Sequence, residues 1–127
     1  NSHCMDFKET QAIYLQIADL VCDYILSGKW REGERVPSVR ELGMQLEVNP
    51  NTVMRAYESL QVREIIANKR GIGFFVSGNA MQRIQIERKM EFVNQVLPDV
   101  FRRMKLLEIP LELLITEYKK YVQDNNS

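Results

Sequence analysis

The sequence predicts a mainly α-helical fold that carries one small β-hairpin. Two consecutive helices with start signals of their own begin at Ser38 and Asn49. After residue 63 the spacing of apolar residues changes from the helical period to that of short strands around two glycines. A further helical pattern fills the chain from about residue 80 onwards. The 127 residues, 45% of them apolar, suffice for one small core with an appendage.

An amphipathic helix is expected from about Thr10 to Ser27. Gly28 follows it as a stop, because glycine readily adopts the left-handed conformation that ends many helices. Cys22 lies inside this helix and is interpreted as a small apolar filler. The apolar stripe of the helix consists of Ile13, Ile17, Leu20, Val21, Tyr24 and Ile25.

A short second helix is expected to start at Ser38. Ser38 and Glu41 have the spacing of a capping box, in which the hydroxyl accepts from a backbone N–H and the carboxylate reaches back. Asn49 followed by Pro50 signals a third helix, because asparagine caps helices and the first turn does not need the N–H that proline lacks. Both helices carry apolar residues at helical spacing. These are Val39, Leu42 and Leu46 in one helix and Val53, Ala56, Tyr57 and Leu60 in the other.

Two short strands are expected at residues 65–67 and 74–76, joined by a turn over residues 68–73. Gly71 and Gly73 supply the backbone freedom that such a turn requires. Lys69 and Arg70 lie at its tip, where they could meet a phosphate backbone. The alternative is an ordinary solvated hairpin whose glycines serve geometry alone. Two capped helices followed by a hairpin are the element order of a winged helix-turn-helix.

A long helical pattern is expected from about residue 80 to residue 107, followed by a last helix that starts at Pro110. Pro98 interrupts the long pattern, so we expect two helical pieces or one bent helix. Helices of about 45 residues in total bury too little surface on their own. We therefore expect them to form a homodimer by packing against a second copy of the chain.

The composition bears on the class of protein. The formal net charge is zero, and residues 28–75 hold eight Lys or Arg against six Asp or Glu, so nucleic-acid binding would depend on local clustering. No apolar run approaches the roughly 20 residues of a membrane span and no secretory signal opens the chain, so we expect a cytoplasmic protein without a membrane segment. His3 is the only histidine, and no Cys or His cluster has metal-ligand spacing. We expect no enzymatic activity, no cofactor and no metal.

Three segments are expected along the chain. Residues 1–5 are interpreted as the remnant of an expression tag and the start of the protein at Met5. Residues 6–77 form the winged-helix domain, and residues 78–127 form a helical dimerisation tail.

Three motifs occur in the order and spacing of one known family. They are GERVPSVREL at residues 33–42, LEVNPNTVMRAY at residues 46–57 and GIGFFV at residues 71–76. Together they resemble the winged-helix DNA-binding domain of the GntR family of bacterial transcriptional regulators, over about residues 10–77. The short helical tail is similar to that of the YtrA-type subfamily, in which the tail serves dimerisation.

The resemblance implies contacts with double-stranded DNA by the arginine of the first motif, by the start of the third helix and by the wing glycines. Basic and polar side chains on the same outward face extend this set. The predicted DNA-binding residues are Ser38, Arg40, Asn49, Asn51, Thr52, Arg55, Lys69, Arg70, Gly71 and Gly73. Arg55 suits either a bidentate contact with guanine or a phosphate contact. Arg40 could instead be a solvated charge, and Asn49 could serve as a helix cap alone.

The sequence departs from the family pattern at three positions. Pro50 and Met54 stand where many members have arginine, so the base contacts of larger relatives are not transferred to them. Glu47 stands at a turn position where glycine is common, which costs about 1 kcal/mol if its φ is positive.

These observations predict a sequence-specific transcriptional regulator, a repressor that binds inverted-repeat operator DNA as a homodimer. The alternative is a winged-helix adaptor that binds a protein partner without sequence-specific DNA binding, and the zero net charge keeps it open. A third interpretation, a sensor of an unknown small-molecule effector, would require a cavity between the tail helices or at the dimer interface.

Overall fold

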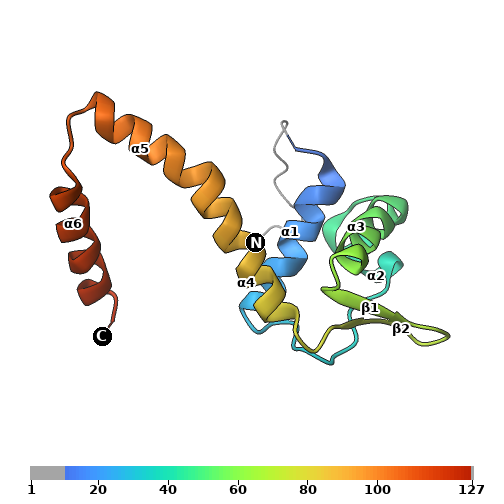
Figure 1. The fold of residues 1–127 in the computed structure, drawn as a ribbon. Coiled ribbons are helices and arrows are strands. Elements are labelled where there is room, and N and C mark those ends of the chain that lie inside the picture. The colour runs from blue at the N-terminus through green and yellow to red at the C-terminus, as the bar shows by residue number, and fades with distance from the viewer. Residues whose placement is uncertain (1–10, 127) are drawn as a thin grey trace. The chain divides into compact units, whose positions relative to one another are not determined.

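The structure is a computed structural model in which residues 11–126 are described, so the predicted tag remnant at residues 1–5 lies outside the described residues. It confirms the predicted fold class, a winged helix-turn-helix followed by a helical segment (Figure 1). The elements are α1 (Ile13–Leu26), α2 (Val39–Leu46), α3 (Pro50–Val62), β1 (Ile66–Lys69), β2 (Gly73–Val76), α4 (Ala80–Glu91), the π-helical η1 (Phe92–Val96), α5 (Leu97–Leu106) and α6 (Leu111–Asp124).

The chain divides into two compact units, one that ends at Glu87 and one that starts at Arg88. In the first unit α3 packs against both α1 and α2, and the apolar faces predicted for these helices meet in one core. An exception is Ile13, which is 45% exposed. Ala80 and Ile84 of α4 are also fully buried there. The first unit therefore takes in residues that the sequence analysis assigned to the tail.

The predicted start signals of α2 and α3 are present. The Ser38 hydroxyl accepts from the Glu41 N–H at 3.1 Å, and the Glu41 carboxylate accepts from the Ser38 N–H at 2.7 Å, which completes the capping box. The Asn49 side chain accepts from the Asn51 N–H at 2.8 Å, with Pro50 in the first turn. Each cap satisfies a backbone donor that the helix itself leaves free.

The turn between α2 and α3 is tight. Glu47 has φ 58° and ψ 45°, the left-handed conformation that side chains with a Cβ disfavour. A Cβ at Gly43 would lie 2.9 Å from the Val48 carbonyl oxygen, so the returning chain requires glycine at that position of α2. These two residues fix how closely α3 follows α2.

Replacement of Glu47 by glycine is expected to raise the free energy of unfolding by about 1 kcal/mol, because glycine adopts a positive φ without steric strain. Urea denaturation followed by circular dichroism measures the change. Glu47→Ala is the matched control, since it removes the exposed side chain but keeps the Cβ. If the alanine and glycine variants are equally stable, the strain at this turn is negligible.

The wing is an antiparallel hairpin in which Ile66 pairs with Val76 and Lys69 pairs with Gly73. Strand pairing therefore continues to Lys69, and the turn covers residues 70–72 instead of the predicted 68–73. Strand β1 also starts at Ile66, one residue later than predicted, because the Ile65 N–H still donates to the Leu60 carbonyl of α3 at 2.9 Å. The hairpin is thus tighter than the sequence predicts.

The segment that leads into α2 runs along the outer edge of the wing. Arg35 forms an isolated bridge with Phe75, and the Val36 N–H donates to the Phe74 carbonyl at 2.9 Å. On the same edge, the Val76 N–H donates to the Glu34 carbonyl at 2.9 Å. The segment of residues 31–37 therefore supports the hairpin as a third extended segment.

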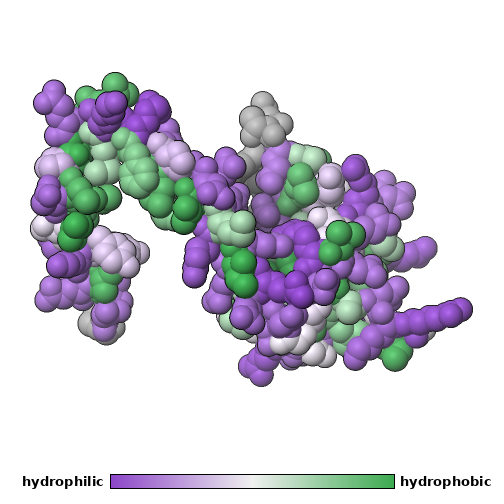
Figure 2. Space-filling view, in the orientation of Figure 1, coloured by the Kyte–Doolittle hydropathy of each residue, from purple (hydrophilic) through white to green (hydrophobic). Residues whose placement is uncertain are grey.

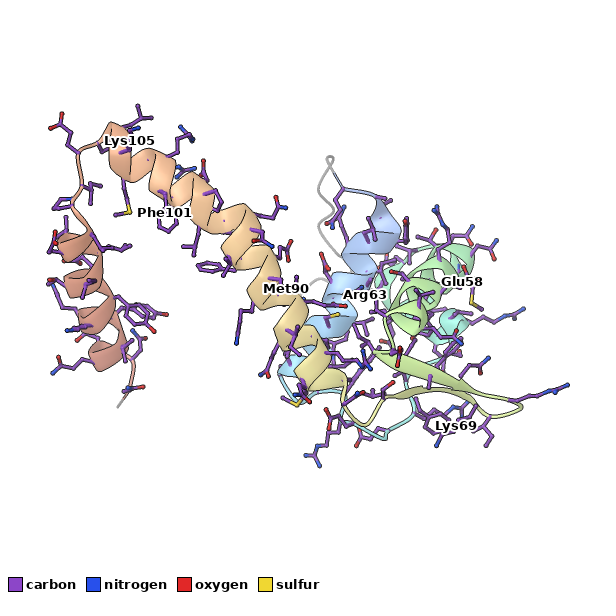
Figure 3. All side chains as sticks on the ribbon, viewed as in Figure 1. Glu58, Arg63, Lys69, Met90, Phe101 and Lys105 are labelled. Atoms are coloured by element: carbon purple, nitrogen blue, oxygen red, sulfur yellow. The ribbon has the colours of Figure 1, made fainter. Side chains whose placement is uncertain are left out.

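Helix α4 is fixed to the first unit by a charged contact at the end of α3. The Arg63 guanidinium pairs with the Glu87 carboxylate at 2.6 Å and lies 3.8 Å from the Cys22 sulfur (Figure 3). The hydrogen bond from Arg63 to Glu87 raises the pKa of the Arg63 guanidinium, so the pair stays charged. Together with the burial of Ala80 and Ile84, this contact docks the start of α4 on the core.

The helical segment of the second unit changes its hydrogen bonding just before Pro98. The Leu97 N–H donates to the Phe92 carbonyl, five residues back, which makes η1 a π-helical turn between α4 and α5. Pro98 has no N–H to offer the preceding turn, and such bulges commonly absorb this defect. No helix in the described residues is long and apolar enough to cross a membrane.

Candidate nucleic-acid interface

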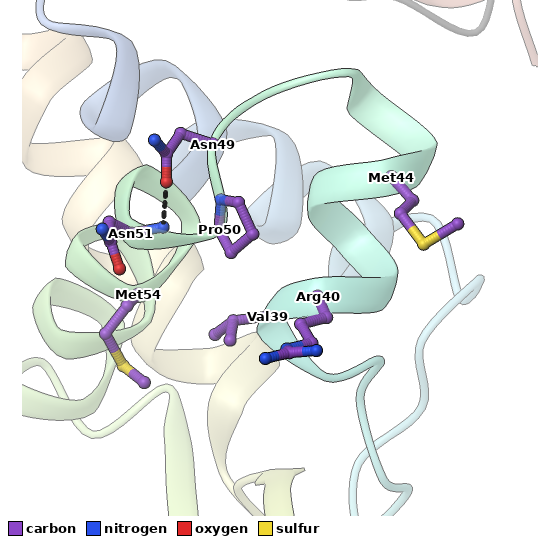
Figure 4. Close-up of a pocket in the computed structure, with 7 residues that line it drawn as sticks. All are labelled: Val39, Arg40, Met44, Asn49, Pro50, Asn51 and Met54. Carbon is purple, nitrogen blue, oxygen red and sulfur yellow. Dashed lines mark hydrogen bonds between the residues drawn. The ribbon is translucent and has the colours of Figure 1, made fainter.

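The first turns of α2 and α3 enclose a hollow of about 560 Å³ on the surface of the first unit (Figure 4). It is lined by Val39, Arg40, Met44, Asn49, Pro50, Asn51 and Met54. Three of the ten predicted DNA-binding residues therefore meet at one place, although they come from two helices and the turn between them. None of the lining residues is acidic, so the hollow suits an anionic or hydrogen-bonding partner.

Arg40 enters this hollow from the first turn of α2, between the two residues of the capping box. It is exposed and has no ion-pair partner in the part of the chain that the structure describes. Ser38 holds the helix start, and its hydroxyl is already occupied as an acceptor for the Glu41 N–H. The hydrogen bonds with Ser38 hold the pKa of the Glu41 carboxyl below its usual range, so this cap carries a negative charge at neutral pH.

Asn49 and Asn51 lie at the start of α3, and the helix cap uses the side chain of Asn49. Both side chains are exposed, and the Asn49 side-chain oxygen is used by the cap, which leaves its amide N–H groups available. Thr52 follows in the first turn and is half-buried. This end of α3 presents donors and acceptors of the kind that read base edges.

Arg55 lies outside the hollow. Its guanidinium carbon is 4.1 Å from the centre of the Tyr14 ring, so a cation–π contact holds it against α1. Arg40 and Arg55 thus occupy different places on the surface. Sequence spacing put Arg55 on the outward face of α3, but it could not reveal Tyr14 as its partner.

The wing places the four other predicted residues together. Gly71 in the turn and Gly73 at the start of β2 have φ of 79° and 137°, which confirms that the hairpin needs glycine at both positions. The Lys69 ammonium lies 4.2 Å from the Phe75 ring centre and Arg70 is exposed (Figure 3). A Cβ at Gly73 would lie 3.1 Å from the Arg35 Nε, so Arg35, which the sequence analysis did not select, lies directly beside the wing.

The described residues contain no group of three or more His, Cys, Asp or Glu that could hold a metal ion. His3 and Cys4 lie outside the described residues. The residues that line the hollow are basic, amide and apolar, and such side chains can recognise a partner by charge, hydrogen bonding and apolar contact.

Comparison with known proteins identifies this arrangement. The sequence pattern described as "Bacterial regulatory proteins, gntR family" matches residues 13–76, which run from the start of α1 to the end of the wing. The uncharacterized HTH-type transcriptional regulator YhcF of Bacillus subtilis is 32% identical over 117 residues, which cover 92% of this chain and 95% of YhcF. The chain belongs to the GntR family. It is a transcriptional regulator with a DNA-binding domain of that family.

Other GntR-family proteins are similar over the tail as well. The HTH-type transcriptional repressor YtrA of Bacillus subtilis is 34% identical over 110 residues, which cover 87% of this chain and 84% of YtrA. The crystal structure of a GntR-family regulator from Bacteroides thetaiotaomicron has a TM-score of 0.79 and 46% identity, covering 89% of this chain and 98% of that one. The predicted resemblance to YtrA-type GntR regulators is confirmed.

Proposed function

We propose that the protein is a repressor that binds inverted-repeat operator DNA as a homodimer in the cytoplasm. The observation that carries the proposal is the hollow between α2 and α3, which Arg40 and Asn51 line together and which no acidic residue lines. The start of a recognition helix enters the major groove, which is wide enough to admit it. The repressor role is supported by the similarity to YtrA, which is itself named a repressor.

We assign different tasks to the predicted residues. Asn51, Thr52 and Arg40 read base edges, since they lie at or beside the first turn of α3. Arg55 contacts a phosphate, because its stacking on Tyr14 turns its charge towards the α1 side of the interface. The remaining residues position the protein: the wing with its cations and glycines reaches the adjacent backbone, while Ser38 and Asn49 hold the helix starts.

The homodimer is supported by the apolar surface of the second unit. Phe101 of α5 is 51% exposed and Leu111 of α6 is 57% exposed, and Figure 2 shows hydrophobic residues on the surface of these helices. Side chains from α5, α6 and their connection also line an apolar hollow of about 400 Å³. Contiguous exposed apolar surface of this kind marks protein interfaces. A two-fold dimer of DNA-binding domains reads two inverted half-sites.

Selection from a random-sequence DNA pool tests the proposal. We expect enrichment of a palindromic sequence that binds with strong salt dependence, because phosphate contacts release counterions. If no sequence is enriched and binding does not depend on salt, the proposal fails and a protein-binding adaptor takes its place. The formal net charge of zero is compatible with that outcome, because it gives the chain no overall attraction to DNA.

Arg40→Ala and Arg55→Ala form a matched pair on the selected duplex. Arg40→Ala is expected to weaken binding by about 1–3 kcal/mol and to relax the preference for the selected sequence over random DNA. Arg55→Ala is expected to weaken binding to the selected duplex and to random DNA equally. It is also expected to reduce the slope of log affinity against log salt concentration by about 1. Fluorescence anisotropy titrations at several salt concentrations measure both effects. Loss of specificity in the Arg55 variant alone would reverse the two assignments.

A further inference from the structure

The hollow between α2 and α3 is more apolar than a surface that reads only hydrogen-bonding groups. Four of its seven lining residues are Val39, Met44, Pro50 and Met54. Met44 is 81% exposed, and Met54 is half-buried on α3, three residues after Asn51. Figure 4 shows Met54 on the α3 side of the hollow and Met44 on the α2 side, with Arg40 and Val39 between them.

Neither methionine is needed to complete the core. On α2 the core positions are filled by Leu42 and Leu46, whereas Met44 is exposed and lines the hollow. On α3 the buried positions are Val53, Ala56, Tyr57 and Leu60, so Met54 lies at the edge of the core and is open to the hollow. Two flexible, polarizable side chains that the core does not use therefore lie on the proposed DNA-facing surface, where they are available for a ligand contact.

The chemistry of the major groove restricts what this contact can be. Among the four bases, only thymine presents an apolar group there, its C5-methyl, while the other base edges present donors and acceptors. The lining residues carry one positive charge from Arg40 and no negative charge, which favours a polyanion over a neutral apolar peptide as the occupant. The amide of Asn51 borders the same hollow and can bond the adjacent base edge.

We propose that Met54, with Met44 as the opposite wall, is a specificity-determining residue that contacts the C5-methyl group of a thymine in each operator half-site. The inference rests on the proposed operator binding and adds the base that the hollow selects. Each half-site then contains a thymine at the position that faces the first turns of α2 and α3.

Replacement of thymine by deoxyuridine tests this proposal, because it removes only the methyl group. The probe is the duplex enriched from the random-sequence pool, with each thymine of both half-sites replaced in turn. We expect one position in each half-site at which the loss of the methyl weakens binding about 4-fold, the effect of burying one methylene-sized group. With Met54→Ala protein this loss is expected to disappear, and with Met44→Ala it is expected to shrink.

Two further variants keep the test independent of folding. Met54→Leu retains an apolar side chain and is expected to retain the deoxyuridine effect. Val62→Ala removes apolar volume from a residue that is 82% exposed at the other end of α3, and it should leave the effect at about 4-fold. Circular dichroism confirms that each variant is folded before titration.

The outcomes separate the two proposals. If a palindrome is enriched but deoxyuridine has no effect, or has the same effect with wild-type and Met54→Ala protein, the methyl contact is wrong and operator binding stands. If the half-sites contain no thymine, the methyl contact is also wrong. If no sequence is enriched, both proposals fail, and the hollow becomes the site of an apolar side chain from a partner protein.

Discussion

A variant with Phe101→Asp and Leu114→Asp is expected to bind operator DNA at least about 100-fold more weakly than the wild-type chain. The two side chains lie on the apolar faces of α5 and α6, and Phe101 projects from α5 into solvent (Figure 3). Carboxylates on these faces would have to be buried unpaired in a dimer, which costs several kcal/mol. A monomer binds one half-site at a time and loses the gain of about 10²–10⁴ that linked sites provide.

Sedimentation velocity at micromolar concentration and anisotropy titration of the operator measure the two parts of this prediction. The matched control is Gln95→Asp with Thr116→Asp, which adds the same charge at exposed polar positions of the same unit. The control should remain a dimer and bind operator with nearly wild-type affinity. If the wild-type chain is a monomer, or if the variant with Phe101→Asp and Leu114→Asp remains a dimer, the second unit does not form the dimer interface.

A Tyr57→Ala variant is expected to lose about 3–5 kcal/mol of stability, the usual cost of truncating a large buried aromatic residue. Tyr57 is fully buried, and its hydroxyl donates to the Pro37 carbonyl at 2.7 Å. Its ring packs against the Phe74 ring in a T-shaped arrangement with centroids 5.1 Å apart. One side chain of α3 therefore contacts both the entry to α2 and the wing. Its loss removes a large part of the total stability of a small domain, which is about 5–15 kcal/mol.

Tyr57→Phe is the matched control, since it keeps the ring and removes the hydroxyl. It should cost about 1 kcal/mol, because the Pro37 carbonyl loses its donor. Urea unfolding followed by the fluorescence of Trp30, the only tryptophan, measures both variants. An alanine variant within about 1 kcal/mol of the phenylalanine variant would mean that the ring does not hold these segments together.

The stability of the wild-type protein is also expected to depend on pH differently from that of the Tyr57→Phe variant. Burial, followed by the nearby negative charge of Glu41, raises the pKa of the Tyr57 hydroxyl above its ordinary value of 10.0. The unfolded chain therefore releases this proton first, and the stability contributed by the neutral hydroxyl is complete below about pH 10 and is lost above it. Wild-type protein should lose stability more steeply than Tyr57→Phe between about pH 10 and 11.

Local signals predicted much of the first unit. The capping box of Ser38, the Asn49 cap and the glycine stop at Gly28 each involve residues within a few positions of one another, and the structure contains all three. The strain at Glu47 was predicted conditionally, and its φ of 58° meets the condition. Such signals are readable because a cap or a left-handed turn depends on the few residues that form it.

Other features depend on contacts between distant parts of the chain. Arg35 lies between α1 and α2 in the chain, but it pairs with the wing at Phe75, 40 residues later. Arg55 was placed on the outward face of α3, but its position is decided by Tyr14, 41 residues earlier. The π-helical turn before Pro98 was expected only as a break or a bend. No local spacing encodes these outcomes.

By itself, the sequence determined the element order, the helix starts and the apolar faces, and its three motifs indicated the family. These follow from the periodicity of apolar residues and from hydrogen bonds that close within one helical turn. Only the tertiary structure decided which side chains share the hollow between α2 and α3. Packing brought Met44 and Met54 to the same concave surface as Arg40 and Asn51, because burial of the core faces of two helices fixes what their outer faces present together.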